Sequence, residues 1–323
     1  MPLSWDQPIM EELRMVEEEI IRNTRSDEPL LTEIAMHAVS SGGKRMRPGI
    51  ALLSFKAVGG TDLQKTVMVA AAFELIHSAT LVHDDINDGA HTRRGTIAAY
   101  RKYGTQRALI AGDFLFVRGF RLGGLIQSED VVEMVAEACS QMAESEMLQT
   151  VVEHDVALPF ETYIRIITGK TAKPIEASAQ VGTYLGGGTL DQIAGMSSFG
   201  LNIGLAFQIV DDILDISGKE KDIGKKRGMD IFDGKANLPL LIAMQDHYPN
   251  SDRLRKIYEK DEKTEEEVEE AITIVKSTDA LEVAMNHARD LQHKSLKGLE
   301  TLPESEFKDA LRLLADTVLM RDR

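Results

Sequence analysis

Two clusters of aspartate are the residues best suited to chemistry, because each can bind a divalent cation. They share the pattern D-D-x-x-D and comprise Asp84, Asp85 and Asp88 in the first and Asp211, Asp212 and Asp215 in the second. The first and last aspartates of each cluster are four residues apart, so a helix places them on one face, where like charges repel. Magnesium would reverse that cost, since it combines carboxylates with phosphate oxygens. One cluster could be a solvated helix end, but two at the ends of apolar helices favour metal sites.

Basic residues gather near both aspartate clusters, which suits an anionic substrate. Lysine supplies a point charge and arginine a planar fork, and both bind phosphate groups. The basic segments are Gly42–Pro48 with Lys44, Arg45 and Arg47, then Arg93 and Arg94, then Lys225, Lys226, Arg227 and Lys235. Surface salt bridging is the alternative for each segment alone. Basic groups beside acidic clusters in an acidic chain favour a metal-bridged diphosphate instead.

Composition and missing motifs argue against several other classes of protein. The 323 residues carry a net charge of −15, so nucleic acid and anionic membrane surfaces are poor partners. The single cysteine, Cys139, precludes an internal disulfide and fits a reducing compartment. Gly169-Lys170-Thr171 resembles the end of a P-loop, but Ile164 stands where that motif needs glycine. A lone His77 without an H-E-x-x-H pattern argues against zinc.

The chain shows no sign of export or of membrane insertion at the sequence level. The first residues lack the basic start and apolar stretch of a signal peptide. We expect no apolar run long enough to span a membrane. A cytoplasmic protein without an integral membrane segment is the resulting prediction.

Helical spacing of apolar residues dominates the chain, and alternating strand patterns are nearly absent. We expect an all-α fold in a single domain over residues 1–323, because no linker or short repeat is visible. Capping boxes at Thr61–Gln64 and Thr189–Gln192 predict the starts of the two helices that lead into the aspartate clusters. Gly123–Gly124 predicts a weak point in another helix. The expected helices are 9–24, 61–88, 100–126, 129–152, 160–185, 189–216, 237–244, 280–299 and 304–319, with a loop at 219–234 and a solvated, charged face at 259–270.

Six segments together resemble the trans-isoprenyl diphosphate synthase, or polyprenyl synthetase, family. They are GGKRMRP at Gly42–Pro48, LIHSATLVHDDIND at Leu75–Asp88, RRG at Arg93–Gly95, GKTA at Gly169–Ala172, FQIVDDILD at Phe207–Asp215 and GKKRGMDIFDGKANLP at Gly224–Pro239. They occur in the family's order and spacing. The resemblance implies an isoprenoid synthase-type bundle, or barrel, of long helices around a deep central cleft, usually as a homodimer.

The same resemblance implies a magnesium-dependent prenyltransferase that joins isopentenyl diphosphate to an allylic diphosphate. About three magnesium ions per site would be held by Asp84, Asp88 and Asp211, with Asp85, Asp212 and Asp215 as further ligands or supports. By position, the isopentenyl diphosphate would be bound by Lys44, Arg47, His77 and Arg94. The allylic diphosphate would be bound by Arg93, Lys170, Lys225 and Lys235. Thr171 and Gln208 would direct oxygen dipoles at the allylic cation, and the released diphosphate would serve as the base.

Two residues depart from the pattern of the family. Asn87 lies at a variable position inside the first aspartate motif, and we expect it to have little effect. Asn237 replaces the usual threonine of the K-x-T-L-P segment. That replacement puts the local hydrogen bonding in doubt, but not the role of Lys235.

The helix that leads to Asp84 should form one wall of the cleft and so set the product length. Counting back from Asp84, the residues pointing down this wall are Thr80, Ala79, Ile76 and Ala72. Ala72 lies roughly 18 Å deeper than Asp84 at the helical rise. Small residues at Ala79 and Thr80, and no insertion in the first motif, resemble medium- and long-chain members, so we predict a product of C25 or longer. A C20 geranylgeranyl product is the alternative, with a floor supplied by candidates Phe73, Met134 or Met142.

Three other functions compete with this interpretation. A class I terpene cyclase would share one D-D-x-x-D motif, but it would lack the GGKRMRP segment. A non-catalytic subunit of a heteromeric synthase would tend to lose aspartate motifs, and both are intact here. A helical scaffold protein would need neither cluster.

Overall fold

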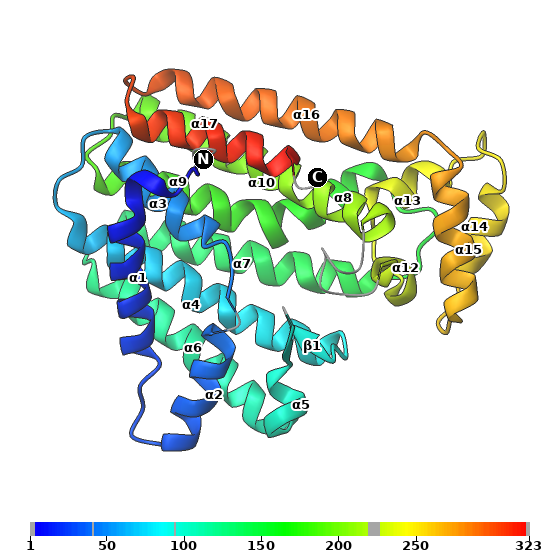
Figure 1. Ribbon diagram of the computed structural model, residues 1–323, viewed down its shortest axis with the longest axis horizontal. Coiled ribbons are helices and arrows are strands. Elements are labelled where there is room, and N and C mark those ends of the chain that lie inside the picture. Colours follow the sequence, from blue (N-terminus) through cyan, green and yellow to red (C-terminus); the bar gives the residue numbers. More distant parts are fainter. Residues whose placement is uncertain (1–3, 41, 94, 219–226, 321–323) are drawn as a thin grey trace. The chain divides into compact units, whose positions relative to one another are not determined.

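The computed structural model describes residues 4–40, 42–93, 95–218 and 227–320, and its architecture is helical (Figure 1). This confirms the all-α fold class. The N-terminal elements are η1 (Gln7–Ile9), α1 (Met10–Asn23), α2 (Pro29–Val39), α3 (Met46–Ala57), α4 (Leu63–Asn87), β1 (Thr92–Arg93), β2 (Thr96–Ile97), α5 (Ala99–Tyr103), α6 (Thr105–Leu125) and α7 (Glu129–Val151). The remaining elements are α8 (Phe160–Ile167), η2 (Thr168–Ala172), α9 (Lys173–Leu185), α10 (Leu190–Ser217), α12 (Met229–Asp233), α13 (Leu238–Ala243), α14 (Ser251–Tyr258), α15 (Glu265–Lys276), α16 (Ala280–Gly298), η3 (Leu299–Thr301) and α17 (Glu306–Leu319).

The chain divides into two compact units, each assembled from separate stretches of sequence. The first unit comprises Met1–Glu137, Ile175–Ser197 and Gly298–Leu313. The second comprises Ala138–Pro174, Ser198–Lys297 and Leu314–Arg323. The first aspartate cluster belongs to the first unit and the second cluster to the second. The expectation of a single domain stays a prediction.

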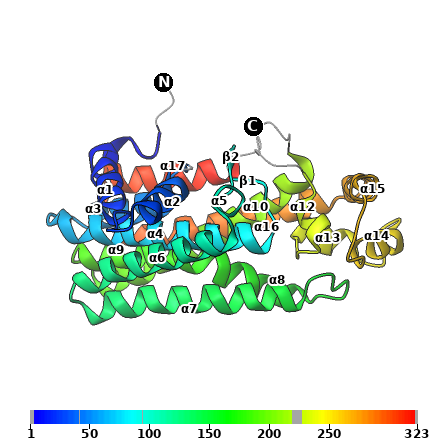
Figure 2. The same ribbon diagram turned by 90° about the horizontal axis from the view of Figure 1, so that it is seen from below.

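The first unit is built on close packing between α4 and α6, which lie side by side in Figures 1 and 2. Gly119 of α6 permits this approach, because a β-carbon there would lie 2.7 Å from Cγ1 of Ile76 and 3.0 Å from the backbone oxygen of Ala72. Gly112, two turns earlier, faces the ring of His83 in the same way. These glycines let α6 brace the helix that carries the first aspartate cluster.

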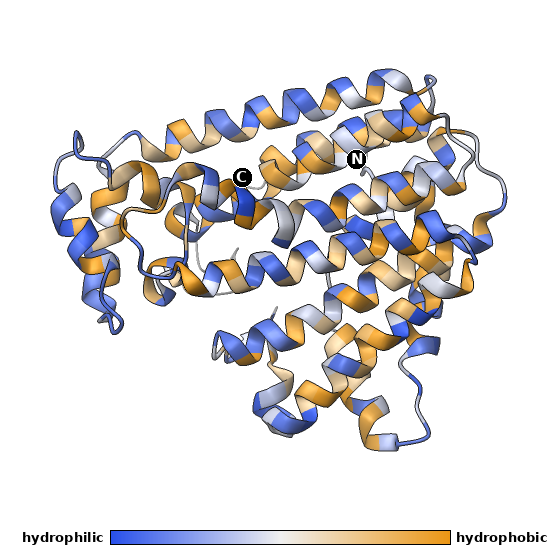
Figure 3. Cartoon of the chain, turned by 180° about the vertical axis from the view of Figure 1, so that it is seen from behind, coloured by the Kyte–Doolittle hydropathy of each residue, from blue (hydrophilic) through white to orange (hydrophobic). Residues whose placement is uncertain are grey.

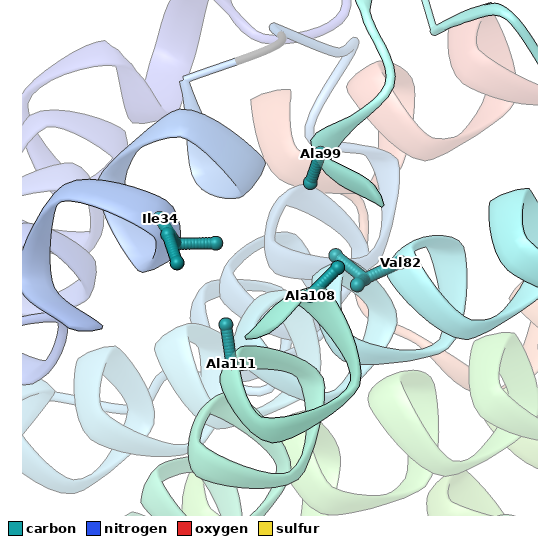
Figure 4. Packing of buried hydrophobic residues seen from close by; sticks show 5 residues of the cluster. All are labelled: Ile34, Val82, Ala99, Ala108 and Ala111. Carbon is teal, nitrogen blue, oxygen red and sulfur yellow. The ribbon is translucent and has the colours of Figure 1, made fainter. Parts of the chain in front are cut away.

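A small hydrophobic cluster fixes the end of α4 against its neighbours. Its members come from α2, α4, α5 and α6, and they are Ile34, Val82, Ala99, Ala108 and Ala111 (Figure 4). Each has an exposed fraction of 5% or less. Three of the five are alanines, so the elements approach closely and a larger side chain would overpack the contact. The cluster therefore holds α5 and the end of α4 in a fixed relation.

The second unit is organised around the part of α10 from Ser198 onward and the α8–η2 segment. A β-carbon at Gly204 would lie 2.6 Å from Cα of Ala172, so α10 and η2 are nearly in backbone contact. Gly169 is equally restricted, since a β-carbon there would lie 2.4 Å from the Gln141 carbonyl oxygen of α7. Glycine is thus needed on both sides of η2.

The two expected capping boxes have opposite outcomes. Thr189 forms one, because its backbone N–H donates to Gln192 Oε1 at 2.9 Å and its Oγ1 accepts from the Gln192 N–H at 3.3 Å. The box expected at Thr61 was wrong. There the N-cap is Asp62, α4 starts one residue later than the box requires, and no side chain in the described structure caps it.

Other boundaries also differ from the expected ones. The helix predicted over 100–126 breaks at Gly104, which has φ of 90°, and it continues unbroken through Gly123–Gly124. Within the loop predicted over 219–234, residues 219–226 lie outside the described chain, and α12 forms from Met229. A two-stranded hairpin, β1–β2, pairs Thr92 with Ile97 and Arg93 with Thr96. Short elements of this kind lack a readable apolar period, since few of their residues are buried.

Two helices are long and apolar enough to cross a membrane by length and composition alone, so the expectation of no such run was wrong. They are α4, whose apolar window is 72% buried, and α10, whose window is 50% buried. Core helices of water-soluble proteins meet the same criterion. Most other helices carry hydrophobic and hydrophilic residues on different faces (Figure 3).

Candidate functional site

The first aspartate cluster occupies the C-terminal end of α4, and the backbone there fixes its geometry. Gly89 has φ of 63° and terminates the helix, because the Ala90 N–H bonds the Asp85 carbonyl oxygen at 3.0 Å. Asp84 and Asp88 are partly exposed on one face of the helix, whereas Asp85 is buried. Thr80 and His77 are also partly exposed and lie one and two turns, respectively, before Asp84 on that face.

Asp85 holds the arginine of the following hairpin. Nε of Arg93 donates to Oδ1 of Asp85 at 2.8 Å, and the two groups form a salt bridge. Burial raises the pKa of Asp85, although the charge of Arg93 opposes that effect. The arrangement makes Asp85 a support for Arg93 rather than a group directed at solvent.

The hairpin that carries Arg93 is anchored to α2 and α5. His37 Nε2 donates to the Ile97 carbonyl oxygen at 2.8 Å, and Arg101 donates to the Gly89 carbonyl oxygen at 3.2 Å. A small cavity of about 20 Å³ adjoins Asp85 and Arg93, which is room for one water molecule. Arg94 lies outside the described residues.

The three cations of the predicted isopentenyl diphosphate segment differ in burial and in partners. Arg45 has φ of 47° and pairs with Glu17 and Glu74, so its charge is used inside the first unit. Lys44 is exposed and Arg47 partly buried. The sequence groups Arg45 with Lys44 and Arg47. The structure separates it from them, because Arg45 forms salt bridges with Glu17 and with the buried Glu74 on α4.

The second aspartate cluster, at the end of α10, shows the same division between exposed and buried members. Asp211 is partly exposed, whereas Asp212 and Asp215 are 2% and 1% exposed. Asp212 accepts hydrogen bonds from the Tyr163 hydroxyl at 2.7 Å, the Gln208 amide at 3.1 Å and the Leu238 N–H at 3.0 Å. Burial, followed by the charge of Asp230, raises the pKa of Asp212 to about 8. Its carboxyl group is therefore occupied within the second unit.

A chain of hydrogen bonds joins the predicted catalytic residues to Asp212. The Thr171 hydroxyl donates to Gln208 Oε1 at 2.7 Å, and Gln208 in turn donates to Asp212. Thr171 lies on η2, a short π-helical turn, and such turns occur frequently at functional sites. Neighbouring Lys170 pairs with Glu146 of α7 at 2.6 Å.

The segment 228–238 is tied to the second cluster at both ends. The Gly228 N–H bonds the Asp215 carbonyl oxygen at 2.7 Å, and the Asp230 N–H bonds Oδ2 of Asp215 at 3.1 Å. Lys235 lies on this segment, with its Nζ 3.4 Å from Asp233. Lys225 lies outside the described residues.

Asn237 resolves the doubt raised by its replacement of threonine. Its Oδ1 accepts from the Leu240 N–H at 3.4 Å, which caps α13. Its Nδ2 donates to the Asp212 carbonyl oxygen at 3.2 Å and to Oδ2 of Asp230 at 2.8 Å. Threonine could supply the cap but only one donor. Asparagine therefore forms more hydrogen bonds between the segment 228–238 and the second aspartate cluster than threonine could form at this position.

The donor chemistry of the partly exposed aspartates fits magnesium. Within the part of the chain that the structure describes, no three acidic, histidine or cysteine side chains gather into a complete coordination set. Magnesium is commonly bound by one or two carboxylates plus substrate phosphates, so an incomplete protein set is compatible with it. The carboxylates with this donor chemistry are Asp84 and Asp88 in the first cluster and Asp211 in the second.

Comparisons with known proteins identify the family of the chain. Residues 28–275 match the family described as polyprenyl synthetase. The chain belongs to the polyprenyl synthetase family. It is 34% identical to octaprenyl diphosphate synthase of Haemophilus influenzae over 94% of this chain and 92% of that protein. It is 38% identical to a short chain isoprenyl diphosphate synthase of Methanothermobacter thermautotrophicus over 97% of this chain and 99% of that protein.

A solved polyprenyl synthase from Caulobacter crescentus, complexed with calcium and isoprenyl diphosphate, has the same fold. The TM-score is 0.94 at 33% identity, and the match covers 99% of this chain and 97% of that one. This polyprenyl synthetase is accordingly a prenyltransferase with the all-α isoprenoid synthase fold, in a metal-dependent family. The resemblance found in the sequence is confirmed.

Several residues of the site were missed by sequence reasoning. Tyr163 lies two turns before Lys170 on the amphipathic helix α8. Its spacing alone does not distinguish it from an ordinary core residue. Asp230 and Glu146 are single acids among many in an acidic chain, so nothing in their spacing distinguished them. Only the fold shows that these side chains contact the predicted site residues or the segment carrying Lys235.

The predicted chain-length wall is buried along most of its length. Ala72, Ile76 and Ala79 have exposed fractions of 0%, 4% and 0%. Ile76 and Ala72 pack against Gly119 of α6, whereas Thr80 is partly exposed, like Asp84. Of the candidate floor residues, Phe73 is buried, and Met134 and Met142 are partly buried.

Proposed function

We propose that this prenyltransferase condenses isopentenyl diphosphate with an allylic diphosphate to give an all-trans polyprenyl diphosphate of C25 or longer. One observation carries the proposal. Each aspartate cluster keeps a partly exposed first member and buries the second in hydrogen bonds, so Asp85 and Asp212 support the site while Asp84 and Asp211 remain outward. Two separate helices would not converge on this arrangement for a solvated surface alone.

The proposed ligands of isopentenyl diphosphate all belong to the first unit, whereas those of the allylic diphosphate come from both units. When bound at Asp84, Asp88 and Asp211, magnesium ions, about three per site, would supply charge neutralisation for the departing diphosphate. Arg93, held by Asp85, would orient the allylic diphosphate, together with Lys170, Lys225 and Lys235. Lys44, Arg47, His77 and Arg94 would hold isopentenyl diphosphate. We propose that residues 1–323 form a single catalytic domain.

Thr171 and Gln208 are proposed to stabilise the allylic cation. Thr171 donates its proton to Gln208, so its own oxygen keeps lone pairs that can be directed at a positive charge. Asp212 fixes the amide of Gln208 through the opposite end. The hydrogen-bonded chain would thus preset these dipoles before substrate arrives, which is how electrostatic stabilisation acts efficiently.

The product length rests on the small residues of α4. Ala79 adds little bulk to the wall, which supports a C25 or longer product over the C20 alternative. The names of the relatives span both classes, since one is an octaprenyl synthase and another a short chain synthase. A remote alternative is a non-catalytic subunit of a heteromeric enzyme, which intact aspartate clusters disfavour.

We further propose a cytoplasmic homodimer without a membrane-spanning segment. The outer face of α6 carries the exposed apolar residues Leu109, Ile110 and Val117, with exposed fractions of 46%, 51% and 63%. An apolar stripe of this kind on one helix is typical of a subunit interface. The burial of α4 and α10 supports their being core helices.

The decisive experiment is a product assay with matched variants. The protein is incubated with magnesium, labelled isopentenyl diphosphate and C5 to C20 allylic starters, and the dephosphorylated alcohols are sized. Asp84→Asn and Asp211→Asn should each lower turnover about a hundredfold or more. Asp191→Asn, which changes an exposed aspartate at the other end of α10, is the control and should retain activity. A ladder ending at C25 to C40 supports the proposal, a stop at C20 shifts the product, and no elongation contradicts it.

A further inference from the structure

A buried lysine stands apart from the proposed catalytic groups. Lys263 lies between α14 and α15 and is only 7% exposed. Its Nζ donates to the Lys260 carbonyl oxygen at 2.6 Å and to the Phe232 carbonyl oxygen at 3.3 Å, and it lies 3.2 Å from Nδ1 of His154. Burying an ammonium group is costly, and burial lowers the pKa of Lys263. Its position therefore indicates a specific local task.

The contacts of Lys263 converge on the turn that precedes Lys235. Phe232 is in the last turn of α12, and Gly234 follows with φ of 70°. The Gly234 carbonyl oxygen accepts from the backbone N–H of His154 at 2.9 Å and from the Tyr258 hydroxyl at 2.8 Å. Three donors from outside α12 thus bind the carbonyl oxygens of this turn. Lys263 binds that of Phe232, and His154 and Tyr258 bind that of Gly234.

The ring of His154 also packs directly against the turn at Gly234. A β-carbon on Gly234 would lie 2.3 Å from its imidazole ring, so the turn is pressed against that ring. Nδ1 of His154 lies 3.1 Å from the Tyr258 carbonyl oxygen as well as near Lys263. One ring nitrogen cannot donate to the carbonyl and accept from the ammonium together, so the two carbonyl bonds are the firm contacts of Lys263.

The opposite side of the same segment is held by the second aspartate cluster. Asp215 bonds Gly228 and Asp230, and the Lys235 N–H bonds the Asp230 carbonyl oxygen at 2.8 Å. The segment 228–238 is consequently fixed from two sides. The cluster fixes one side, and Lys263, Tyr258 and His154 fix the other.

We propose that Lys263 is a positioning residue that holds the Phe232–Lys235 turn and, through it, the diphosphate-binding side chain of Lys235. The inference rests on the proposed function, which assigns Lys235 to the allylic diphosphate. Lys263 itself touches backbone and not substrate. Its removal should loosen the turn and weaken diphosphate binding without removing a diphosphate ligand.

The first test compares Lys263→Met with Lys260→Met by hydrogen–deuterium exchange of the full chain. Lys260 lies in the same turn, but its side chain pairs with Glu267 and is exposed. Lys263→Met should speed exchange about fivefold in peptides covering 228–238, whereas Lys260→Met should not. Tyr258→Phe removes the hydroxyl donor to Gly234 and should give a smaller increase. Equal exchange in wild type, Lys263→Met and Tyr258→Phe overturns the proposal.

The second test is a double-mutant cycle on binding of inorganic diphosphate with magnesium, measured by calorimetry. Lys263→Met should raise the dissociation constant of diphosphate about fivefold, which is the change expected when a net contribution of about one hydrogen bond is lost. In a Lys235→Met background the same change should have little further effect, because the two residues act as one unit. Equal losses in both backgrounds would show that Lys263 does not act through Lys235. If wild type fails to elongate any starter, the proposed function fails, while the exchange comparison still decides whether Lys263 holds the turn.

Discussion

Burial decides what each aspartate of the two clusters can do. Asp85 and Asp212 give their oxygens to Arg93 and to Tyr163, Gln208 and Leu238, so they build the site from within. Asp84 and Asp211, each one residue earlier, are partly exposed. A helix turns by about 100° per residue, so adjacent aspartates in a D-D pair point in different directions, and packing decides which of them is buried. The doubled aspartate is thus a pairing of one outward group and one supporting group.

Tyr163 should be the most sensitive of these supports. Tyr163→Phe removes a buried hydroxyl that donates to Asp212, and we expect the free energy of unfolding to fall by about 1–2 kcal/mol. Prenyl transfer should slow as well, because Asp212, which accepts the Gln208 amide, would be held by one hydrogen bond fewer. Urea denaturation measures the first effect. Tyr184→Phe is the control, since its hydroxyl bonds Asp130 in an exposed pair and should cost less than about 0.5 kcal/mol. Equal losses for the two variants would contradict the assignment.

The single cysteine should be nearly inert in the folded protein. Burial raises the pKa of Cys139 to about 11, so at pH 8 only about one thiol in a thousand is ionised. Reaction with a disulfide reagent should therefore be about a hundredfold slower than in guanidinium-unfolded protein, whose thiol pKa is ordinary. The rate should rise about tenfold per pH unit up to pH 11. Rapid reaction of the folded protein at pH 8 would show that the thiol is not shielded.

At the scale of the helices, long periodic segments were predictable and their ends less so. The helices leading to both aspartate clusters followed from their apolar content, and the Thr189 box placed one start correctly. The Thr61 box failed by a single residue, and Gly104 rather than Gly123–Gly124 broke the next helix. A glycine breaks a helix only where its φ must be positive, and that depends on tertiary packing. Contacts such as Tyr163 to Asp212 join residues 49 apart in sequence, which local patterns cannot register.

Asn237 offers a test of one helix start. Asn237→Ala removes the cap of α13 and two donor bonds, and it should lower the free energy of unfolding by about 2 kcal/mol. Asn237→Thr keeps an oxygen for the cap and should lose only about 1 kcal/mol. Thermal denaturation of the two variants measures the difference. Should threonine be as damaging as alanine, the cap would not be the stabilising contact.

Ala79 tests whether α4 forms the wall that limits product length. Ala79→Tyr places a bulky ring at a buried position, and the product should shorten to about C15 to C20. The first condensation on a C5 starter should continue, which separates a shortened pocket from a misfolded one. Radiolabelled products are sized after dephosphorylation. An unchanged ladder from an active, folded variant would show that the wall assignment is wrong.

At the scale of the whole chain, α6 serves two purposes. One face uses Gly112 and Gly119 to reach α4, and the outer face exposes Leu109, Ile110 and Val117. The outer face also exposes Asp113, which lies among these three apolar residues. Exposed apolar residues gathered on one face favour a partner, so they support the proposed dimer with this face of α6 at its interface.

Val117→Arg should therefore weaken self-association. An unpaired charge buried at an interface costs about 3 kcal/mol or more, so the dimer dissociation constant should rise at least about a hundredfold. Light scattering coupled to size-exclusion chromatography measures the mass. Leu190→Arg is the control, because Leu190 is 85% exposed on a different helix and its charge should leave the mass unchanged. A Val117→Arg protein that keeps the wild-type mass would place the interface elsewhere.

The discontinuous make-up of the two units has a consequence for synthesis. The first unit needs Gly298–Leu313 and the second needs Leu314–Arg323, so neither can be completed until almost the whole chain has left the ribosome. Until then the apolar helices α4 and α10 lack part of the surroundings that bury them. The nascent chain should therefore depend on chaperones for most of its translation, and truncation before Gly298 should yield insoluble protein and not a smaller working enzyme.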